Sequence, residues 1–436
     1  MLVGIKDNFS THIGPDDAEL TTYYQAPMNA TVVSLIEDGG GTVVGKTNLD
    51  EYGMGSMTTF SIHGQTKMPQ GVGESRIFTS PGGSSDTGGS VRLPAAWCGI
   101  VGFKPSYGQC SRYGLLAFAS SLDTVGILSK TVEDARKVYR TISKPDQLDM
   151  TCLSENFRDE MARLIRQSGR QISAGSLPLD GIAIGIPQEY YVHELDDDII
   201  RVWKETANNL AQLGAEIRPI SLPHTKYALS VYYILAPAEA SSNLARYDGV
   251  RYGKLAQTLD PKDCEVYKIA AKTRSENFGP EVQRRIFIGT HSLTAGTYEG
   301  YFLKAQKLRR LIQKDFDTAF NLPNLLATEN NPGSAVYNKD GGVDAILMPT
   351  SVTAAPEIPT SPSSDLEAKN KDPTAAYVND IMTVPASLAG LPAISIPAGL
   401  SSSNGLPLSL QLVGQFGDDD LVLDIARHIH NIYQSP

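Results

Sequence analysis

Short apolar runs alternate along the chain with longer stretches in which apolar residues recur every three or four positions. The short runs are typical of buried strands, and the longer stretches are typical of amphipathic helices. Alternation of the two favours an α/β fold with a mixed or mostly parallel sheet. We predict strands at residues 2–5, 42–47, 100–105, 181–187, 345–350 and 392–399, and helices at residues 30–39, 131–142, 197–214 and 297–320.

Three polar stretches interrupt this pattern, at residues 143–181, 330–342 and 353–373. Each is rich in Gly, Pro, Ser or Asn, the residues that favour turns and loops. None has the composition of a clean linker between independent units. We therefore expect one domain over residues 1–436, with loop insertions at these three places.

Charge and composition narrow the possible functions. The 436 residues carry a formal net charge of −10, and an acidic surface repels phosphate backbones. Binding of nucleic acid would therefore need a more basic partner or a local basic patch. No apolar run is long enough to span a bilayer. The four cysteines form no C-x-x-C pair, which favours a reducing compartment.

The stretch GGTVVGKT, residues 40–47, satisfies the phosphate-loop pattern G-x-x-x-x-G-K-T. In a phosphate loop a strand precedes the first glycine and a helix follows the lysine. Here the predicted helix comes first, so we interpret the glycines as its C-cap. A nucleotide site at Lys46 remains an alternative. His428 and His430 lie two apart on a helix and face different ways, so we expect no metal site.

Residues 80–95 read SPGGSSDTGGSVRLPA and raise a chemical possibility. The glycines of DTGGS allow successive backbone N–H groups to converge on a developing oxyanion. Ser90, at the end of that turn, is placed to attack the carbonyl carbon, but a serine nucleophile needs a base. Without a suitable histidine, the natural candidate is Lys6, which follows a buried strand. The alternative is a flexible surface loop and an ordinary strand-end lysine.

Three motifs resemble the signature of the amidase signature family: GIKDN (4–8), PGGSS (81–85) and DTGGSVRLPA (86–95). The resemblance implies an α/β fold with a central mixed sheet covered by helices on both faces. It also implies hydrolysis of an amide by a triad of one lysine and two serines, one of them in a cis peptide.

Carried over by resemblance, Lys6 is the base, Ser84 the cis-peptide serine that relays a proton, and Ser90 the nucleophile. The oxyanion hole then falls on the residues that precede the nucleophile, namely Thr87, Gly88 and Gly89.

Longer motifs resemble one branch of this family, the A subunits of glutamyl-tRNA(Gln) amidotransferases. They include SRYGLLAFASSLD (111–123), AEASSNLARYDG (238–249) and FGPEVQRRIFIGTHSL (278–293). The resemblance implies that the chain hydrolyses glutamine and passes ammonia to the B subunit of the amidotransferase, beside a small third subunit. Glu-tRNA(Gln), ATP and Mg would be bound mainly by the partner, with no cofactor in this chain. The resemblance is closer to mitochondrial than to bacterial members, so we expect the mitochondrial matrix, with the cytoplasm of a bacterium as the alternative.

By resemblance, Arg309 binds the α-carboxylate of glutamine, Asp380 binds its α-ammonium, and Tyr252 assists. The helix pattern supports Arg309 independently, because it is the only charge on an apolar stripe, and a charge on a buried face needs a partner or a ligand. The alternatives are a structural salt bridge for Arg309 and an ion-pair or helix-terminal role for Asp380. The stripe consists of Phe302, Ala305, Arg309, Ile312, Phe316 and Phe320.

The chain departs from the family pattern at two places. Ser84 and Ser90 are six residues apart, whereas the resemblance implies a small-residue helix and a further strand between the two serines. We expect that this segment is missing between Ser85 and Asp86. We also expect that the N-terminal helical segment of family members is missing before Met1.

These departures leave two further hypotheses beside the glutaminase subunit. One is a stand-alone amidase that acts on another small amide. The other is a catalytically inactive structural subunit, whose value lies in binding its partners.

Overall fold

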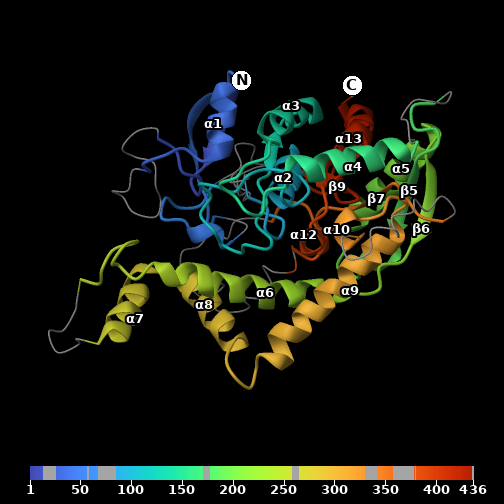
Figure 1. Cartoon of the computed structure of the whole chain (residues 1–436). Coiled ribbons are helices and arrows are strands. Elements are labelled where there is room, and N and C mark those ends of the chain that lie inside the picture. Colours follow the sequence, from blue (N-terminus) through green and yellow to red (C-terminus); the bar gives the residue numbers. More distant parts are fainter. Residues whose placement is uncertain are drawn as a thin grey trace.

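A seven-stranded sheet with the strand order β4-β3-β8-β9-β7-β5-β6 forms the centre of the fold (Figure 1). The computed structural model describes residues 1–12, 26–55, 58–66, 85–169, 177–257, 265–328, 341–356, 378 and 380–434. The strands of this sheet are β3 (Val101–Lys104), β4 (Ile127–Ser129), β5 (Ala183–Pro187), β6 (Glu216–Ile220), β7 (Ala345–Pro349), β8 (Ala393–Leu400) and β9 (Pro407–Gly414).

The sheet is mixed, as predicted. Strand β5 is parallel to both β6 and β7, whereas β9 runs antiparallel to β7 and β8, and β3 antiparallel to β8 and β4. The predicted strands at 100–105, 181–187, 345–350 and 392–399 are confirmed as β3, β5, β7 and β8. All five residues of β7 are buried, which explains why it reads as an uninterrupted apolar run.

Helices cover both faces of the sheet, which confirms the predicted α/β class (Figure 1). On β9, the Gln411 side chain accepts a hydrogen bond from Arg92 of α2, while a side chain at Gly414 would meet Val422 of α13. Positions three apart on a strand point to opposite faces. The helices are α1 (Thr31–Asp38), α2 (Arg92–Cys98), α3 (Val132–Ile142), α4 (Glu155–Gln167), α5 (Asp197–Gln212), α6 (Ala228–Asn243), α7 (Val266–Asn277), α8 (Pro280–Ser292), α9 (Lys304–Ala319), α10 (Leu325–Thr328), α12 (Val384–Ala389) and α13 (Asp419–Gln434).

The four predicted helices are confirmed as α1, α3, α5 and α9. Helix α3 shows a start signal that can be recognised in the sequence: the Thr131 side chain caps the helix by accepting a hydrogen bond from the Asp134 N–H. Helix α9 is preceded by a π-helical turn, Glu299–Leu303, within the predicted span 297–320. The predicted stripe is also confirmed: Ala305, Ile312, Phe316 and Phe320 are buried.

The predicted loop at 143–181 is wrong in part, because α4 forms within it. The helical signal is present, because Phe157, Met161, Leu164 and Ile165 lie on one face of the helix, but the surrounding turn-forming residues led to the loop prediction. Most of the predicted loop at 330–342, and all but the first residues of the one at 353–373, lie outside the described residues.

Strands β1 (Leu2–Lys6) and β2 (Thr42–Thr47) confirm two further predictions, and they form a separate parallel pair. Helix α1 precedes β2, and Gly40 between them has the left-handed φ of 77° that favours glycine. The Lys46 amine donates to the Phe9 carbonyl and lies 3.5 Å from Asp7. The order helix–glycines–strand and these contacts contradict a phosphate loop at Lys46.

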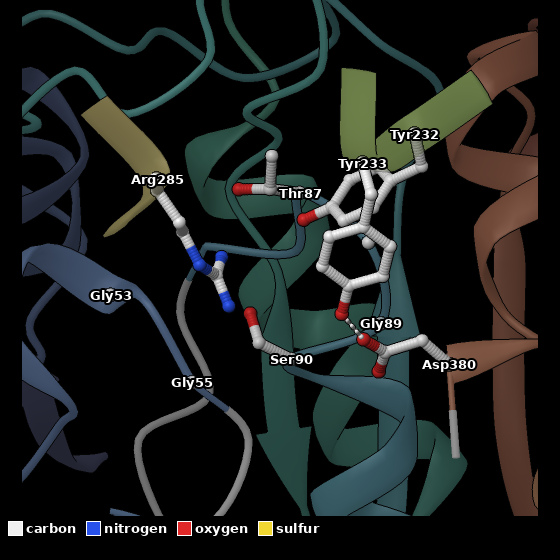
Figure 2. Close-up of a pocket in the computed structure, with 10 residues that line it drawn as sticks. Gly53, Gly55, Thr87, Gly89, Ser90, Tyr232, Tyr233, Arg285 and Asp380 are labelled. Atoms are coloured by element: carbon white, nitrogen blue, oxygen red, sulfur yellow. Dashed lines mark hydrogen bonds between the residues drawn. The ribbon is translucent and has the colours of Figure 1, made fainter. Parts of the chain in front are cut away.

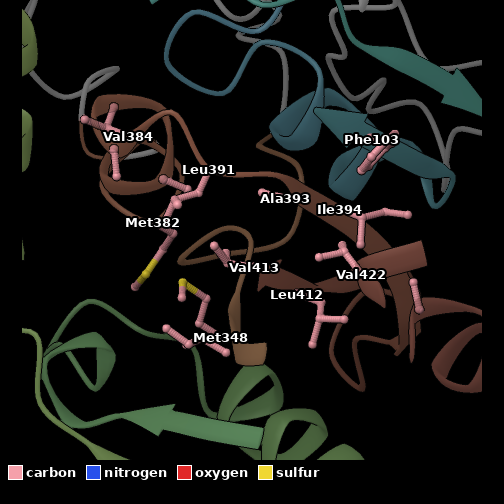
Figure 3. Packing of buried hydrophobic residues seen from close by; sticks show 14 of the residues in the cluster. Phe103, Met348, Met382, Val384, Leu391, Ala393, Ile394, Leu412, Val413 and Val422 are labelled. Carbon is pink, nitrogen blue, oxygen red and sulfur yellow. The ribbon is translucent and has the colours of Figure 1, made fainter. Parts of the chain in front are cut away.

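Buried apolar side chains from most elements form one large cluster around the sheet. Figure 3 shows part of it, where strands β3, β7, β8 and β9 pack against the residues that lead into and out of α12 and against α13. The labelled members are Phe103, Met348, Met382, Val384, Leu391, Ala393, Ile394, Leu412, Val413 and Val422.

Helices α7 and α8 and the start of α9 project away from the sheet as an arm (Figure 1). Within the described ranges, no helix has the length and apolar character needed to cross a bilayer.

Candidate active site

The residues Ser85–Val91 form a tight turn that leads into α2, and neighbouring segments fix both of its ends. The N–H of Asp86 donates to the Thr124 carbonyl at 2.7 Å, and Ser85 forms an isolated antiparallel bridge with Val125. The Thr87 hydroxyl donates to the buried carboxylate of Asp123 at 2.7 Å. This turn holds Ser90 directly before the helix.

An entirely buried ion pair lies beneath the turn. The Arg92 guanidinium contacts both carboxylate oxygens of Asp86 at 2.9 Å and also donates to the Thr383 carbonyl and the Ser387 hydroxyl. Burial alone would raise the pKa of Asp86, but Arg92 reverses that effect and holds this pKa below its usual value. The pair therefore anchors the turn to α2 and to α12 while both charges are retained.

Replacing Arg92 with Leu is expected to lower the free energy of unfolding by about 3–5 kcal/mol, because Asp86 would remain buried without its partner. Urea titration of the full chain measures this change. The double variant Asp86→Leu/Arg92→Leu is the matched control, since it removes both charges and should recover most of the loss. A double variant no more stable than Arg92→Leu alone would contradict this interpretation.

Glycine at position 89 is required by close packing. The residue has a φ of 149°, and a Cβ there would lie 2.1 Å from the Thr383 Oγ1. That hydroxyl in turn donates to the Gly88 carbonyl at 2.7 Å. The backbone of the turn is thus pressed against the segment that precedes α12, and its conformation is fixed from both sides.

Figure 2 shows the small pocket on which this turn opens, with about 310 Å³ of empty space that includes the solvent at its mouth. The Ser90 side chain is half-buried there, and its hydroxyl donates to the Ser85 carbonyl. The described residues that line the pocket are Gly53, Gly55, Thr87, Gly88, Gly89, Ser90, Tyr232, Tyr233, Arg285 and Asp380.

Asp380 supplies a buried carboxylate to this pocket. Its side chain accepts a hydrogen bond from the Tyr233 hydroxyl at 2.8 Å, drawn as a dashed line in Figure 2. Burial raises the pKa of Asp380 to about 6, and the bond from Tyr233 only partly offsets this effect. The group is therefore ionised at neutral pH and protonated a little below pH 6.

Arg285 supplies a buried cation opposite Asp380, and Figure 2 shows its guanidinium directed toward Ser90. Helix α8 can approach α6 closely because residue 289 is a glycine. A Cβ at Gly289 would lie only 1.9 Å from the Pro237 carbonyl oxygen. One turn earlier on each helix, Arg285 lies over the Tyr233 ring at 5.8 Å. It is also paired with Glu281 at 2.6 Å. Buried and paired in this way, the guanidinium remains charged.

Lys6 is 4% exposed at the end of β1, and it is not among the residues that line the pocket. It lies close to Asp50: burial raises the pKa of Asp50, while the charges of Lys6 and of Arg285 both oppose that rise. A Cβ at Gly55, a residue of the pocket wall, would lie 2.3 Å from the Asp50 carboxyl carbon. Lys6 therefore lies near the Asp50 carboxylate, which packs against Gly55 in the wall of the pocket.

The structure brings together five of the residues predicted for the site: Thr87, Gly88, Gly89, Ser90 and Asp380. The remaining predictions have other outcomes. Ser84, with the cis peptide expected there, lies outside the described residues.

Arg309 and Tyr252 are not brought to the pocket. The Arg309 guanidinium donates to the Ser121 hydroxyl, the Ser121 carbonyl and the Leu388 carbonyl at 2.7–2.9 Å. Tyr252 is 53% exposed and contacts the Tyr247 ring. The buried charge of Arg309 on the α9 stripe is thus satisfied by groups of the protein itself. This arrangement agrees with a structural role for Arg309 rather than with binding of a ligand.

The sequence interpretation missed five residues of the pocket, and Arg285 is the charged one; the others are Gly53, Gly55, Tyr232 and Tyr233. The signal for Arg285 is the one applied to Arg309, because Val282, Arg285, Gly289 and Ser292 are buried at helical spacing on α8. Tyr232 and Tyr233 gave no comparable signal. They lie in α6, which is apolar on most sides.

Comparison with known proteins places this geometry in a family. A family model described as Amidase matches residues 1–85 and 75–423. The chain belongs to the amidase signature family. The matched residues include the whole Ser85–Val91 turn, all of α2 and Asp380, so the pocket described above lies within the part of the chain that matches the family.

Three amidase relatives are similar over nearly the whole chain, and each is the A subunit of a glutamyl-tRNA(Gln) amidotransferase. The mitochondrial protein of Emericella nidulans is 44% identical over 98% of this chain and 88% of that protein. The protein of Bartonella tribocorum is 42% identical over 98% of this chain and 82% of that protein. The crystal structure of the Thermotoga maritima protein is 36% identical, covers 100% of this chain and 83% of that one, and superimposes with a TM-score of 0.71.

Across the residues that the structure describes, no group of three or more His, Cys, Asp and Glu side chains is arranged to hold a metal ion.

Proposed function

We propose that this chain is the glutaminase subunit, or A subunit, of a glutamyl-tRNA(Gln) amidotransferase. One observation carries the proposal: a serine on an oxyanion turn shares its pocket with one buried carboxylate and one buried guanidinium. Asp380 matches the α-ammonium of a free amino acid. Arg285 bonds to Glu281 through Nε, and the outer end of its guanidinium, directed toward Ser90 in Figure 2, matches the α-carboxylate. A simple amide has neither charged group, so a stand-alone amidase for such a substrate would not need Asp380 or Arg285. The two charges therefore favour glutamine as the substrate.

The reaction begins when the Ser90 Oγ bonds to the side-chain amide carbon of glutamine. The carbonyl oxygen becomes an oxyanion and is held by the backbone of Thr87, Gly88 and Gly89. The C–N bond then breaks, ammonia leaves with the proton taken from Ser90, and a glutamyl ester remains. Water hydrolyses this ester to glutamate and frees the Ser90 hydroxyl.

We assign the proton transfers to Lys6 and Ser84, as the family resemblance implies. Support for Lys6 comes from its burial at the end of β1 and from its proximity to Asp50 behind the pocket wall. The role of Ser84 rests on the resemblance alone.

The test of this function is the choice of substrate. The full chain should release ammonia from glutamine at least tenfold faster than from butyramide, which has a similar amide but no charged α-groups. Glutamate is measured together with ammonia, and the two products should appear in equal amounts. Equal rates on both amides would favour the stand-alone amidase, and no hydrolysis of either would favour the inactive structural subunit.

The pH dependence of glutamine turnover should report Asp380. Because burial raises its pKa from 3.8 to about 6, the carboxylate is protonated below pH 6 and can no longer bind an ammonium group. We expect kcat/KM for glutamine to fall about tenfold per pH unit below pH 6. A matched profile on butyramide is the control, since that amide does not use Asp380.

Asp123, whose pKa burial also raises to about 6, supports Thr87 and would affect both substrates. An acid limb of the same size on glutamine and butyramide would therefore contradict the role of Asp380 and indicate a group that both reactions use, such as Asp123 or the base Lys6.

Ammonia formed here would pass to the B subunit of the amidotransferase, where ATP and Mg activate the glutamate of Glu-tRNA(Gln), with a small third subunit completing the complex. The arm supports a partner surface of this kind. Val266 is 80% exposed, Tyr267 68% and Phe287 76%, and a partner that covered these side chains would remove apolar surface from water. The named mitochondrial relative supports the mitochondrial matrix as the location.

A further inference from the structure

Helix α8, which carries Arg285 into the pocket, is held at both of its ends. Near its C-terminal end, Gly289 lies against the Pro237 carbonyl of α6. At the opposite end, the N–H of the N-cap residue Gly279 donates to both carboxylate oxygens of Glu51, at 2.9 and 3.2 Å. This second contact comes from a segment 228 positions earlier in the chain.

The half-buried carboxylate of Glu51 suits this position closely. The first N–H groups of a helix have no partner within the helix, and its N-terminus carries a partial positive charge, so an anion there is stabilising. A Cβ at Gly279 would lie 2.3 Å from the Glu51 Oε2, so a glycine is needed for the carboxylate to come this near. Across the described residues Glu51 forms no ion pair, and its carboxylate binds the N–H of Gly279 instead.

The next residue, Tyr52, holds the same end of α8 through aromatic contacts. Its ring meets those of Phe278 and Tyr247 edge to face, with 5.4 and 5.1 Å between the ring centres. Tyr52 has a left-handed φ of 53°, which is costly for any residue other than glycine and persists only where the surroundings fix it. Two consecutive residues, Glu51 and Tyr52, therefore hold the two consecutive residues that precede α8.

The segment that caps α8 is itself part of the pocket wall. Gly53 and Gly55, which follow directly, both line the pocket. Asp50, which precedes it, is 2% exposed and accepts the backbone N–H groups of Thr58 and Phe60, each at 2.9 Å. The position of α8 is thus tied to the pocket by one short and firmly held stretch of chain.

The cap matters for the site because of where Arg285 stands on the helix. Arg285 follows Gly279 by six residues, or about 9 Å along the axis, so a shift of the N-terminal end moves its guanidinium as well. Its bond to Glu281 joins two residues of the same helix, so that bond moves with α8 and does not fix Arg285 relative to Ser90. A misplacement of about 1 Å can lower a rate by about 10²-fold.

We propose that Glu51 is a positioning residue for the choice of substrate: by capping α8 from the pocket wall, it sets where Arg285 meets the α-carboxylate of glutamine. The inference rests on the proposed function, which assigns Arg285 to that carboxylate. Glu51 is not among the residues that line the pocket, so it acts through the helix and not on the substrate itself.

The test measures KM and kcat separately in the full chain carrying Glu51→Ala. We expect KM for glutamine to rise about tenfold while its kcat, and kcat/KM for butyramide, change less than about threefold, because only the fit of the α-carboxylate is affected. A cap that served stability alone would lower the folded fraction, and with it kcat for both amides, but would leave KM as it is. The matched control is Glu51→Gln, whose side-chain oxygen can still accept the Gly279 N–H and should keep KM within about threefold.

A double variant shows whether Glu51 acts through Arg285. In an Arg285→Gln background, Glu51→Ala should raise KM for glutamine less than about twofold further, because the group that it positions is gone. An unchanged KM in Glu51→Ala, the same rise in both backgrounds, or a Glu51→Gln variant as impaired as Glu51→Ala would overturn the proposal.

The proposed function fails by a different result. Equal hydrolysis of glutamine and butyramide by the unchanged chain would refute that function and this inference with it. A preference for glutamine that survives intact in Glu51→Ala would overturn the inference alone.

Discussion

Replacing Ser90 with Ala is expected to lower glutamine hydrolysis by at least about 10³-fold, because the nucleophile of a covalent mechanism cannot be replaced by its neighbours. The change removes one hydroxyl whose hydrogen bond goes to the Ser85 carbonyl. The Asp86–Arg92 pair and the Thr383 contact that hold the turn are unaffected. Release of ammonia and glutamate from the full chain measures the effect.

The melting temperature controls for folding, since a half-buried serine without a structural role should alter stability by about 0.5 kcal/mol or less. Turnover that remains within tenfold of the unchanged chain would mean that another group attacks the amide. Turnover lost together with a large fall in the melting temperature would require Ser90→Cys as a second variant. That variant keeps a side chain able to donate, and its slow residual hydrolysis would restore the assignment, whereas a correctly folded Ser90→Cys without hydrolysis would leave it unsupported.

The second large effect is expected for Arg285→Gln. A charge-assisted hydrogen bond to a carboxylate contributes about 2–4 kcal/mol when its partner is left unpaired, which corresponds to roughly 30- to 1000-fold in kcat/KM for glutamine. Butyramide has no α-carboxylate, so its kcat/KM should change less than threefold. Both substrates are measured on the same preparation, so that a general loss of folded protein affects them equally.

Arg309→Gln is the matched control, because Arg309 is a part-buried arginine whose guanidinium bonds only to groups of the protein in the structure. Its three bonds to Ser121 and Leu388 are structural, so the change should lower stability and affect both amides alike. If Arg309→Gln instead abolishes glutamine turnover and spares butyramide, while Arg285→Gln does neither, the assignment based on resemblance is correct. The pocket assignment of Arg285 would then be wrong.

The elements that could be predicted from sequence are those whose burial leaves a regular pattern. Strand β7 is buried on both faces, and α3 carries a cap and a stripe of spacing three and four, so both are legible. Helix α6 is not, because it contains Pro237 and is apolar on most sides, which leaves no amphipathic period. Helix α4 does carry the pattern, since Phe157, Met161 and Leu164 recur at helical spacing, but it lies within a stretch rich in turn-forming residues.

The site divides in the same way. The oxyanion turn and Ser90 are contiguous in sequence, so a single motif names them. Arg285 reaches the pocket beside Tyr233 because Gly289 lets α8 approach α6, and that is a contact between segments about fifty residues apart. Arg309 shows the limit of a lone buried charge as a signal, because the carbonyls of the fold can satisfy it as fully as a ligand.

The central claim is that Ser90 attacks the side-chain amide of glutamine. The most direct measurement is to mix the full chain with glutamine, quench in acid within one turnover, and locate the glutamyl ester by peptide mass spectrometry. We predict an ester on the Ser90 hydroxyl and none in Ser90→Ala. Glutamate formed without such an ester, or an ester on a different residue, would contradict it.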